Sequence, residues 1–216
     1  MKNKIRFLAT GDFHSDTKLI NNIEKYNDLD SIDYILFLGD LSDKKKDFKK
    51  LLSKFKNKPI LMVPGNHETK KQLKILENHY NVHFISKNTK QIHKDLVIFG
   101  PNNLNIGENS TDESSILNNL IEKYNEIKDI KFKIMLSHIP ASNTKIGDAS
   151  PFFPYIGGSI AIKEFLENFK VDLSLVGHIH ETSGLEEIVS KNKVLNVAKT
   201  SKIIEFDINK KEINIF

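Results

Sequence analysis

The segment Val171-Asp172-Leu173-Ser174-Leu175-Val176-Gly177-His178-Ile179-His180 contains an apolar run followed by two histidines one residue apart. The run predicts a buried strand over residues 173–176, and the histidines follow its expected end. The chain has only eight histidines, so two at one strand end need an explanation. Residues two apart in an extended chain point to the same side, which places His178 and His180 on one face, with Gly177 letting the backbone turn beneath them.

The same arrangement follows four other predicted strands. Each ends at a polar motif that contains Asp, Asn or His, namely Gly11-Asp12-Phe13-His14, Gly39-Asp40, Gly65-Asn66-His67-Glu68 and Ser137-His138. In open α/β sheets, functional sites form beyond the carboxyl ends of the strands. One such motif would be an ordinary turn, but five of them predict a common site. His79, His83 and His93 lie inside expected elements and receive no role.

Apolar and amphipathic segments alternate through the first two thirds of the chain. Strands are expected at residues 4–9, 33–38, 59–63, 83–86, 91–93, 96–99, 132–136 and 173–176, and helices at 17–26, 46–55, 69–78, 114–128 and 160–169. Short antiparallel strands are expected at 185–190, 194–197, 202–206 and 212–215, with turns at Lys191-Asn192 and Asn209-Lys210. This order predicts an α/β fold with two sheets and outer helices, in one domain over residues 1–216.

Composition limits the function classes. Cysteine is absent, which excludes disulfides and thiolate metal sites. No segment approaches the roughly 20 apolar residues of a membrane helix, so we expect a cytoplasmic protein without a membrane partner. The net charge of +4 comes from scattered lysines and one arginine, Arg6. Bidentate guanidinium clamps on phosphate are therefore nearly unavailable, and a nucleic-acid partner is open but not favoured.

The side chains of the strand-end motifs indicate metal binding. Asp12, Asp40 and Asn66 offer oxygen ligands, and the histidines His14, His138, His178 and His180 offer nitrogen ligands. A mixed set without sulfur suits Mn²⁺, Fe, Zn²⁺, Ni²⁺ or Co²⁺ better than Mg²⁺ or Ca²⁺. Seven candidate ligands are too many for one ion. They suit two ions bridged by a carboxylate, about 3.5–4 Å apart as in two-metal hydrolytic sites.

The ordered set of motifs resembles the calcineurin-like metallophosphoesterases. The resemblance extends from the first strand to His180, and every signature position is filled. It implies a four-layer α/β/β/α sandwich with two mixed β-sheets and a dinuclear site at one end of them. It also implies that one metal is held by Asp12, His14, Asp40 and His180 and the other by Asp40, Asn66, His138 and His178, with Mn²⁺ as the first expectation.

The resemblance implies that metal-bridging hydroxide attacks phosphorus in line. His67, left over from coordination, would stabilise the transition state or protonate the leaving alkoxide. Asp43 stands where protein phosphatases of the family place an Asp, and we expect it to orient His67. Its alternative is a helix N-cap ahead of Lys46. Those phosphatases continue with Arg-Gly where this chain has Lys44-Lys45, so phosphoprotein phosphatase activity is not implied.

We therefore expect a metal-dependent phosphodiesterase that acts on a small phosphate ester. The alternatives are a phosphomonoesterase or a nuclease with the same site, or a non-catalytic scaffold of the same fold. The irregular segment 141–159 follows His138 and is expected at the substrate rim. Within it, Gly157-Gly158-Ser159 could meet an anion, or Ser159 could be a plain N-cap. Three aromatic residues could stack on a ring or pack the loop down, namely Phe152, Phe153 and Tyr155.

Overall fold

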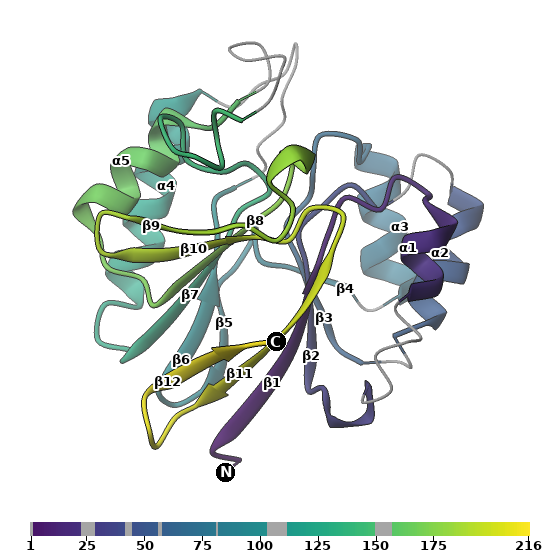
Figure 1. Ribbon diagram of the computed structural model, residues 1–216, viewed down its shortest axis with the longest axis horizontal. Helices are drawn as coiled ribbons and strands as arrows, with labels where there is room; N and C mark the ends of the chain where they lie inside the picture. Colours follow the sequence, from purple (N-terminus) through teal and green to yellow (C-terminus); the bar gives the residue numbers. More distant parts are fainter. Residues whose placement is uncertain are drawn as a thin grey trace.

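Two six-stranded sheets lie face to face in the centre of the molecule (Figure 1). The computed structural model describes residues 2–22, 29–41, 45–55, 58–80, 82–102, 112–149 and 157–216. The first sheet has the order β12-β11-β1-β2-β3-β4. Its bounds are β1 (Lys4–Thr10), β2 (Tyr34–Phe37), β3 (Ile60–Met62), β4 (Val82–Phe84), β11 (Ser201–Asp207) and β12 (Glu212–Ile215). Strands β1 to β4 are parallel, while β11 is antiparallel to both β1 and β12.

The second sheet has the order β5-β6-β7-β8-β10-β9. Strands β6, β7, β8 and β10 are parallel, and the edge strands β5 and β9 run antiparallel to their neighbours. The bounds are β5 (Lys90–His93), β6 (Leu96–Phe99), β7 (Phe132–Leu136), β8 (Leu173–Val176), β9 (Glu186–Val189) and β10 (Asn192–Asn196). Both sheets are therefore mixed, as the sequence predicted.

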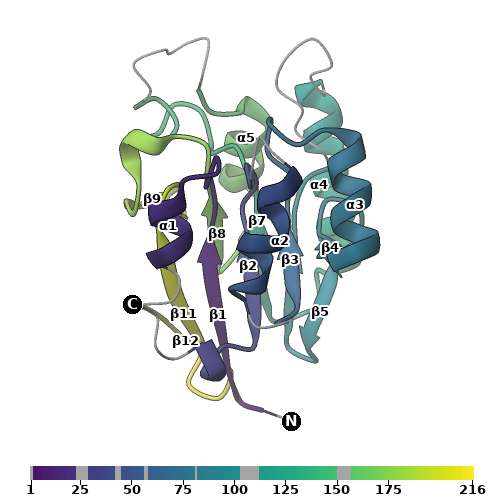
Figure 2. The ribbon, with the colours of Figure 1, turned by 90° about the vertical axis from the view of Figure 1, so that its right-hand side faces the viewer.

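Helices cover the outer face of each sheet (Figure 2). The first sheet carries α1 (Thr17–Asn22), α2 (Lys45–Ser53) and α3 (Lys70–Tyr80), and the second carries α4 (Glu113–Glu126) and α5 (Ile160–Asn168). Two short 3-10 helices complete the described elements, η2 (Leu29–Ser31) and η3 (His180–Thr182). The four-layer α/β/β/α sandwich is confirmed. None of the described helices has the length and apolar character needed to cross a bilayer.

Three hydrophobic clusters hold the four layers together. Side chains alternate between the two faces of a strand, so Phe7 of β1 and Ile134 of β7 lie in the cluster between the sheets. Their neighbours Leu8 and Met135 belong to the two outer clusters, beneath the helices. Because the inner cluster is buried from both sides, the two sheets keep a fixed relation, and so do the loops at their ends.

A buried lysine also joins the two sheets. Lys123 of α4 donates from Nζ to the carbonyl of Ser86, beyond β4, at 2.7 Å and to that of Gly100, beyond β6, at 2.8 Å. Burial lowers the pKa of Lys123 to about 8. This ammonium group therefore joins the end of one sheet to the end of the other.

The C-terminal strands differ in one respect from the expected antiparallel set. Strand β10 pairs in parallel with β8, and it begins at Asn192, which was expected in a turn. The Asn192 side chain is buried, accepts from Val171 N at 2.8 Å and donates to Phe169 O at 3.0 Å. These bonds satisfy the backbone where α5 leads into β8, and they explain a polar residue at the start of an inner strand.

Candidate metal centre

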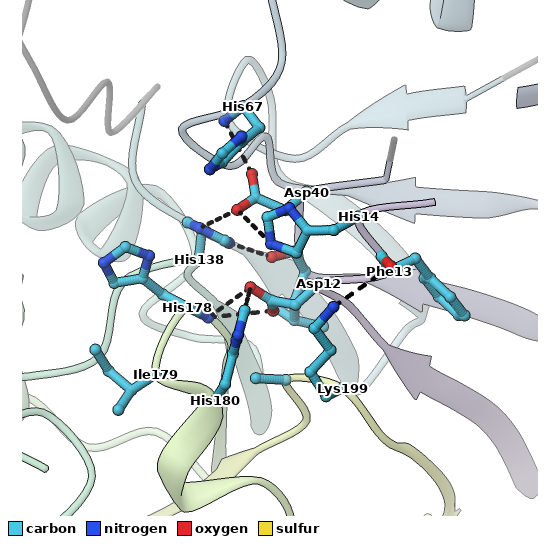
Figure 3. A network of polar contacts seen from close by, with 12 residues as sticks. Asp12, Phe13, His14, Asp40, His67, His138, His178, Ile179, His180 and Lys199 are labelled. Atoms are coloured by element: carbon cyan, nitrogen blue, oxygen red, sulfur yellow. Dashed lines mark hydrogen bonds and ion pairs between the residues drawn. The ribbon is translucent and has the colours of Figure 1, made fainter. Parts of the chain in front are cut away.

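The five strand-end motifs meet at one edge of the sandwich (Figure 3). The loops are joined through their backbones: Asp12 N donates to Gly39 O at 2.9 Å, and His14 N donates to Asp40 O at 3.1 Å. In the second sheet, Gly177 N donates to His138 O at 3.0 Å. Parallel strands place their carboxyl ends together, so the convergence follows from the sheet topology.

Asp12 connects the β1 loop to the β8 loop. Its side chain is fully buried, and both carboxylate oxygens accept from His178 N at 3.1 Å. His180 Nε2 lies 3.3 Å from Asp12 Oδ1. The two histidines of the opening segment thus approach Asp12 differently, one through its backbone and the other through its ring.

Asp40 lies at the middle of the cluster. Its Oδ1 accepts from His67 N at 2.9 Å, while Oδ2 is 3.4 Å from His14 Nε2 and 3.5 Å from His138 Nε2. Burial opposes ionisation, but the charge of His138, the hydrogen bonds and His14 hold the pKa of Asp40 well below its usual range. The carboxylate therefore carries its negative charge between two imidazoles.

His138 has a fixed tautomer at Nδ1. That atom lies 2.6 Å from Leu38 O, and a carbonyl can only accept, so Nδ1 carries a proton. Nε2 then faces Asn66 Oδ1 at 3.0 Å. Burial disfavours the charged ring, but Asp40 and Asp12 raise the pKa of His138 to about 10. A ring that donates its Nδ1–H to a backbone carbonyl and leaves Nε2 facing a cluster of candidate ligands has the usual arrangement of a metal-ligating histidine.

His178 offers a nitrogen without a partner. Among the described residues, no group hydrogen-bonds its buried Nε2. Burial and the nearby His138 lower the pKa of His178 to about 4, so its imidazole is neutral at physiological pH. An unsatisfied buried acceptor costs about 1–3 kcal/mol, which a bound cation would remove.

The glycines of the motifs permit close approach to the carboxylates. A β-carbon on Gly177 would lie 2.5 Å from Asp12 Oδ2, and one on Gly65 would collide with Asp40 Oδ1. Gly177 does not have a positive φ; the chain turns at His178, whose φ is 70°, and Ile179 N donates back to Gly177 O at 2.8 Å. The residue is needed because a side chain there would displace Asp12.

Four side chains of the cluster project from strained backbone. Asp12, His14, Asp40 and His178 all have positive φ, at 56°, 44°, 53° and 70°. This conformation costs roughly 1–2 kcal/mol for a residue with a β-carbon. Such strain persists where the surrounding structure holds it, and it is concentrated at functional sites.

The donor set fits divalent cations. Three groups have ligand atoms that all lie within 4.8 Å of one another: Asp12 with His14 and His180, Asp12 with Asp40 and His138, and His14 with Asp40 and His67. The structure thus brings all seven expected ligands to one place, with Asn66 and His178 beside these groups. His67 is exposed, and its ring centroid lies 4.7 Å from that of His14. Asp43 lies outside the described residues.

Sequence reasoning missed two residues that hold the loops. Glu68 is buried, and its carboxylate accepts from Asp40 N at 3.0 Å, Leu41 N at 2.6 Å and Gly65 N at 2.7 Å. Burial and the charge of Asp40 raise its pKa. Asn196, also buried, donates to Ile179 O at 2.7 Å and fixes the loop of His178 and His180. In the sequence, the available signal for both residues was a polar side chain next to a run of apolar residues.

Ser159 is an N-cap rather than an anion site. Its Oγ accepts from Ile162 N at 3.2 Å and donates to Glu113 Oε2 at 2.6 Å, while Ala161 N donates to the same carboxylate oxygen at 2.6 Å. Glu113 thus accepts from the Ala161 amide at this helix start, and Ser159 N donates to Pro140 O at 2.8 Å. The aromatic residues expected at the rim lie outside the described residues, namely Phe152, Phe153 and Tyr155.

A two-sheet α/β sandwich with carboxylates and imidazoles at the strand ends offers the kind of donor set that two-metal hydrolytic sites use. The sequence model of the calcineurin-like phosphoesterases matches residues 5–182, and the chain belongs to this family. The family hydrolyses phosphate esters and typically uses two divalent metal ions. No curated protein sequence matches the chain.

Solved structures share the fold at low identity. The TT1561 protein of Thermus thermophilus has a TM-score of 0.67 and 14% identity, with 98% of each chain covered. A dimetal phosphatase from Danio rerio has a TM-score of 0.64 and 11% identity, covering 93% of this chain and 92% of that one. Phosphopantetheinyl hydrolase from Mycobacterium tuberculosis has a TM-score of 0.61 and 11% identity, covering 92% and 90%.

Proposed function

We propose that the protein is a phosphodiesterase that depends on two divalent metal ions, with Mn²⁺ as the first choice. The observation that carries this proposal is the convergence of seven oxygen and nitrogen side chains, among them His178, whose buried Nε2 has no hydrogen-bond partner among the described residues. When bound, the ions would supply Lewis-acid stabilisation and a water nucleophile of lowered pKa.

The contacts support two ligand sets that share Asp40. Asp12, His14, Asp40 and His180 would hold one ion, and Asp40, Asn66, His138 and His178 the other. Asp40 Oδ2 lies 3.4 Å from a histidine of the first set and 3.5 Å from one of the second, as a bridging carboxylate would require. The Leu38 carbonyl orients His138, and His178 N orients Asp12.

His67 is the proposed proton donor. Its backbone is held by Asp40, while its ring is exposed beside His14, where a leaving alkoxide could reach it. A histidine there would protonate the leaving oxygen, with Asp43 proposed to fix the ring. Because His67 also forms a candidate ligand group with His14 and Asp40, its role needs the separate test given in the Discussion.

The position of the single arginine supports a diester over a monoester. Arg6 lies near the start of β1, at the opposite end of the strand from Asp12, and its side chain contacts Ser31 and Glu205. No guanidinium is therefore available to clamp a monoester dianion bidentately. A diester carries one negative charge less and needs fewer cationic contacts.

The test compares rates on bis-p-nitrophenyl phosphate and p-nitrophenyl phosphate after loading with Mn²⁺. We expect metal-dependent hydrolysis with the higher kcat/KM for the diester. Faster turnover of the monoester would overturn the diester preference while leaving the two-metal site. A reloaded protein with neither bound metal nor activity on either ester would overturn the whole proposal.

A further inference from the structure

Lys199 lies on the crossing between the two sheets. Strand β10 of the second sheet leads through this residue into β11 of the first. Val197 N donates to Val176 O at 2.8 Å, and Lys199 N donates to Gly11 O at 3.2 Å. The crossing is therefore attached to the ends of β8 and β1, the two strands that lead to His178 and Asp12.

The side chain of Lys199 is directed toward the metal centre (Figure 3). Its Nζ lies 3.5 Å from the carbonyl of Phe13, the residue between Asp12 and His14. The backbone has a φ of 53°, the same left-handed conformation that the four strained residues of the cluster adopt. The bond from Lys199 N to Gly11 O ties this lysine to the loop that continues into Asp12.

Lys199 has no carboxylate partner in the described part of the chain. Its Nζ makes a long hydrogen bond to Phe13 O, and the residue is half-buried. By contrast, Lys193 on the preceding strand pairs with Glu186 at 2.7 Å. The contact with Phe13 places the Lys199 ammonium group beside the loop that carries Asp12 and His14. The ammonium group of Lys199 has three N–H donors, so it can still donate hydrogen bonds to a ligand.

Electrostatics favour an anion at this position. On the proposed function, on which this inference rests, two divalent cations would be held by the loops that adjoin the Lys199 ammonium group, and like charges repel more strongly where bulk water is partly excluded. The scissile phosphate would lie on the ions themselves. A negative group next to that phosphate would lie between the ions and Lys199 and would interact favourably with both.

We propose that Lys199 is a specificity-determining residue that binds a second anionic group of the substrate, adjacent to the scissile phosphate. The substrate class is a phosphate ester or anhydride with a neighbouring phosphate or carboxylate. Lysine suits this role because it acts as a point charge with three donors and imposes no planar geometry on the group it binds.

The experiment measures binding of non-hydrolysable phosphonate analogues of AMP and ADP by isothermal titration calorimetry. The protein is loaded with Mn²⁺ and dialysed free of unbound metal. These probes share one nucleoside and differ by one anionic group. We expect wild type to bind the ADP analogue at least about tenfold more tightly, which is what one hydrogen bond to a charged group provides. Lys199→Gln should remove most of this preference, Lys199→Arg should retain it, and the control Lys193→Gln should not change it.

The metal content of each sample shows whether the inference about Lys199 or the proposed two-metal function has failed. If wild type retains Mn²⁺ but shows no preference for the ADP analogue, or if Lys199→Gln keeps the wild-type preference, the inference about Lys199 is wrong and the metal centre stands. Loss of metal from Lys199→Gln would also overturn the inference, because it would assign the residue to the integrity of the centre. If wild type itself binds no metal, the proposed function fails.

Discussion

His138 Nδ1 donates to the carbonyl of Leu38 at 2.6 Å, from the loop after β7 in one sheet to the loop after β2 in the other. The bond ties the two halves of the sandwich at the point where the proposed metal ligands meet. It also leaves Nε2 directed at Asn66 and Asp40. The proposed metal centre and the sheet interface therefore share one side chain.

Replacing His138 should affect both stability and metal binding. In His138→Ala the buried carbonyl of Leu38 loses its donor, and we expect metal-free unfolding to be easier by about 1–3 kcal/mol. Urea denaturation in the presence of a chelator measures this difference. The second metal equivalent should also be lost. The exposed His79 of α3 offers a matched control, and His79→Ala should change neither quantity. Unchanged metal content in His138→Ala would remove this residue from the ligand set.

Substitution of Gly177 tests whether its close approach to Asp12 is needed for metal binding. A β-carbon there would lie 2.5 Å from Asp12 Oδ2 and 3.1 Å from Leu38 O, so Gly177→Ala should shift the carboxylate and weaken metal binding about 10–100-fold. Gly184 is the control, because its added β-carbon meets nothing within 4 Å while its φ is 77°. Gly184→Ala should lose about 1 kcal/mol of stability and keep its metal affinity. Equal metal affinities in the two variants would contradict the close-approach explanation.

Lys123 should give the folded protein a specific dependence on alkaline pH. Burial lowers its folded pKa to about 8 from the ordinary 10.5, so between these values the unfolded chain binds more protons than the folded one. The contribution of Lys123 to the free energy of unfolding therefore rises as pH increases from about 8 to 10.5, by at most about 3 kcal/mol. The difference in unfolding free energy between wild type and Lys123→Met, measured by urea denaturation across this range, should show the rise. A difference that stays constant with pH would contradict the lowered pKa.

The strand ends were predictable because their pattern is local. A buried run followed by Gly-Asp or Gly-Asn-His identifies each motif, and parallel pairing brings Asp12, Asp40 and Asn66 to one edge. The position of Lys199 depends on the crossing from β10 to β11, which joins two sheets and leaves no periodic signal. For the same reason the parallel pairing of β10 with β8 was missed.

Other roles depend on distances that no sequence pattern encodes. Glu68 belongs to a recognised motif, yet its acceptance of three backbone N–H groups is visible only once the loops after β2 and β3 are placed together. Gly177 was expected to let the chain turn, but the positive φ of the turn lies at His178, and the close approach of Gly177 to Asp12 was not predicted. The sequence thus predicted which side chains lie together more fully than it predicted the contacts that hold them.

The variant His67→Ala tests whether His67 acts in catalysis or in metal coordination. If it protonates the leaving group, His67→Ala should keep two metal equivalents and lower kcat by about 10²–10⁴-fold, with a smaller loss for esters of good leaving groups such as p-nitrophenol. Steady-state kinetics on aryl and alkyl diesters, together with metal analysis, measure both effects. Loss of a metal ion from His67→Ala would instead place this residue in the ligand group with His14 and Asp40.

The most direct test of the central claim is the metal content of the wild-type protein and of Asp40→Ala after chelator treatment and reloading with Mn²⁺. Elemental analysis by mass spectrometry should find two ions per chain in the wild type, because the two proposed ligand sets share Asp40. The variant should retain one ion or none, since the bridge contributes to both sets. No more than trace metal in the wild type, or two ions in Asp40→Ala, would contradict the account.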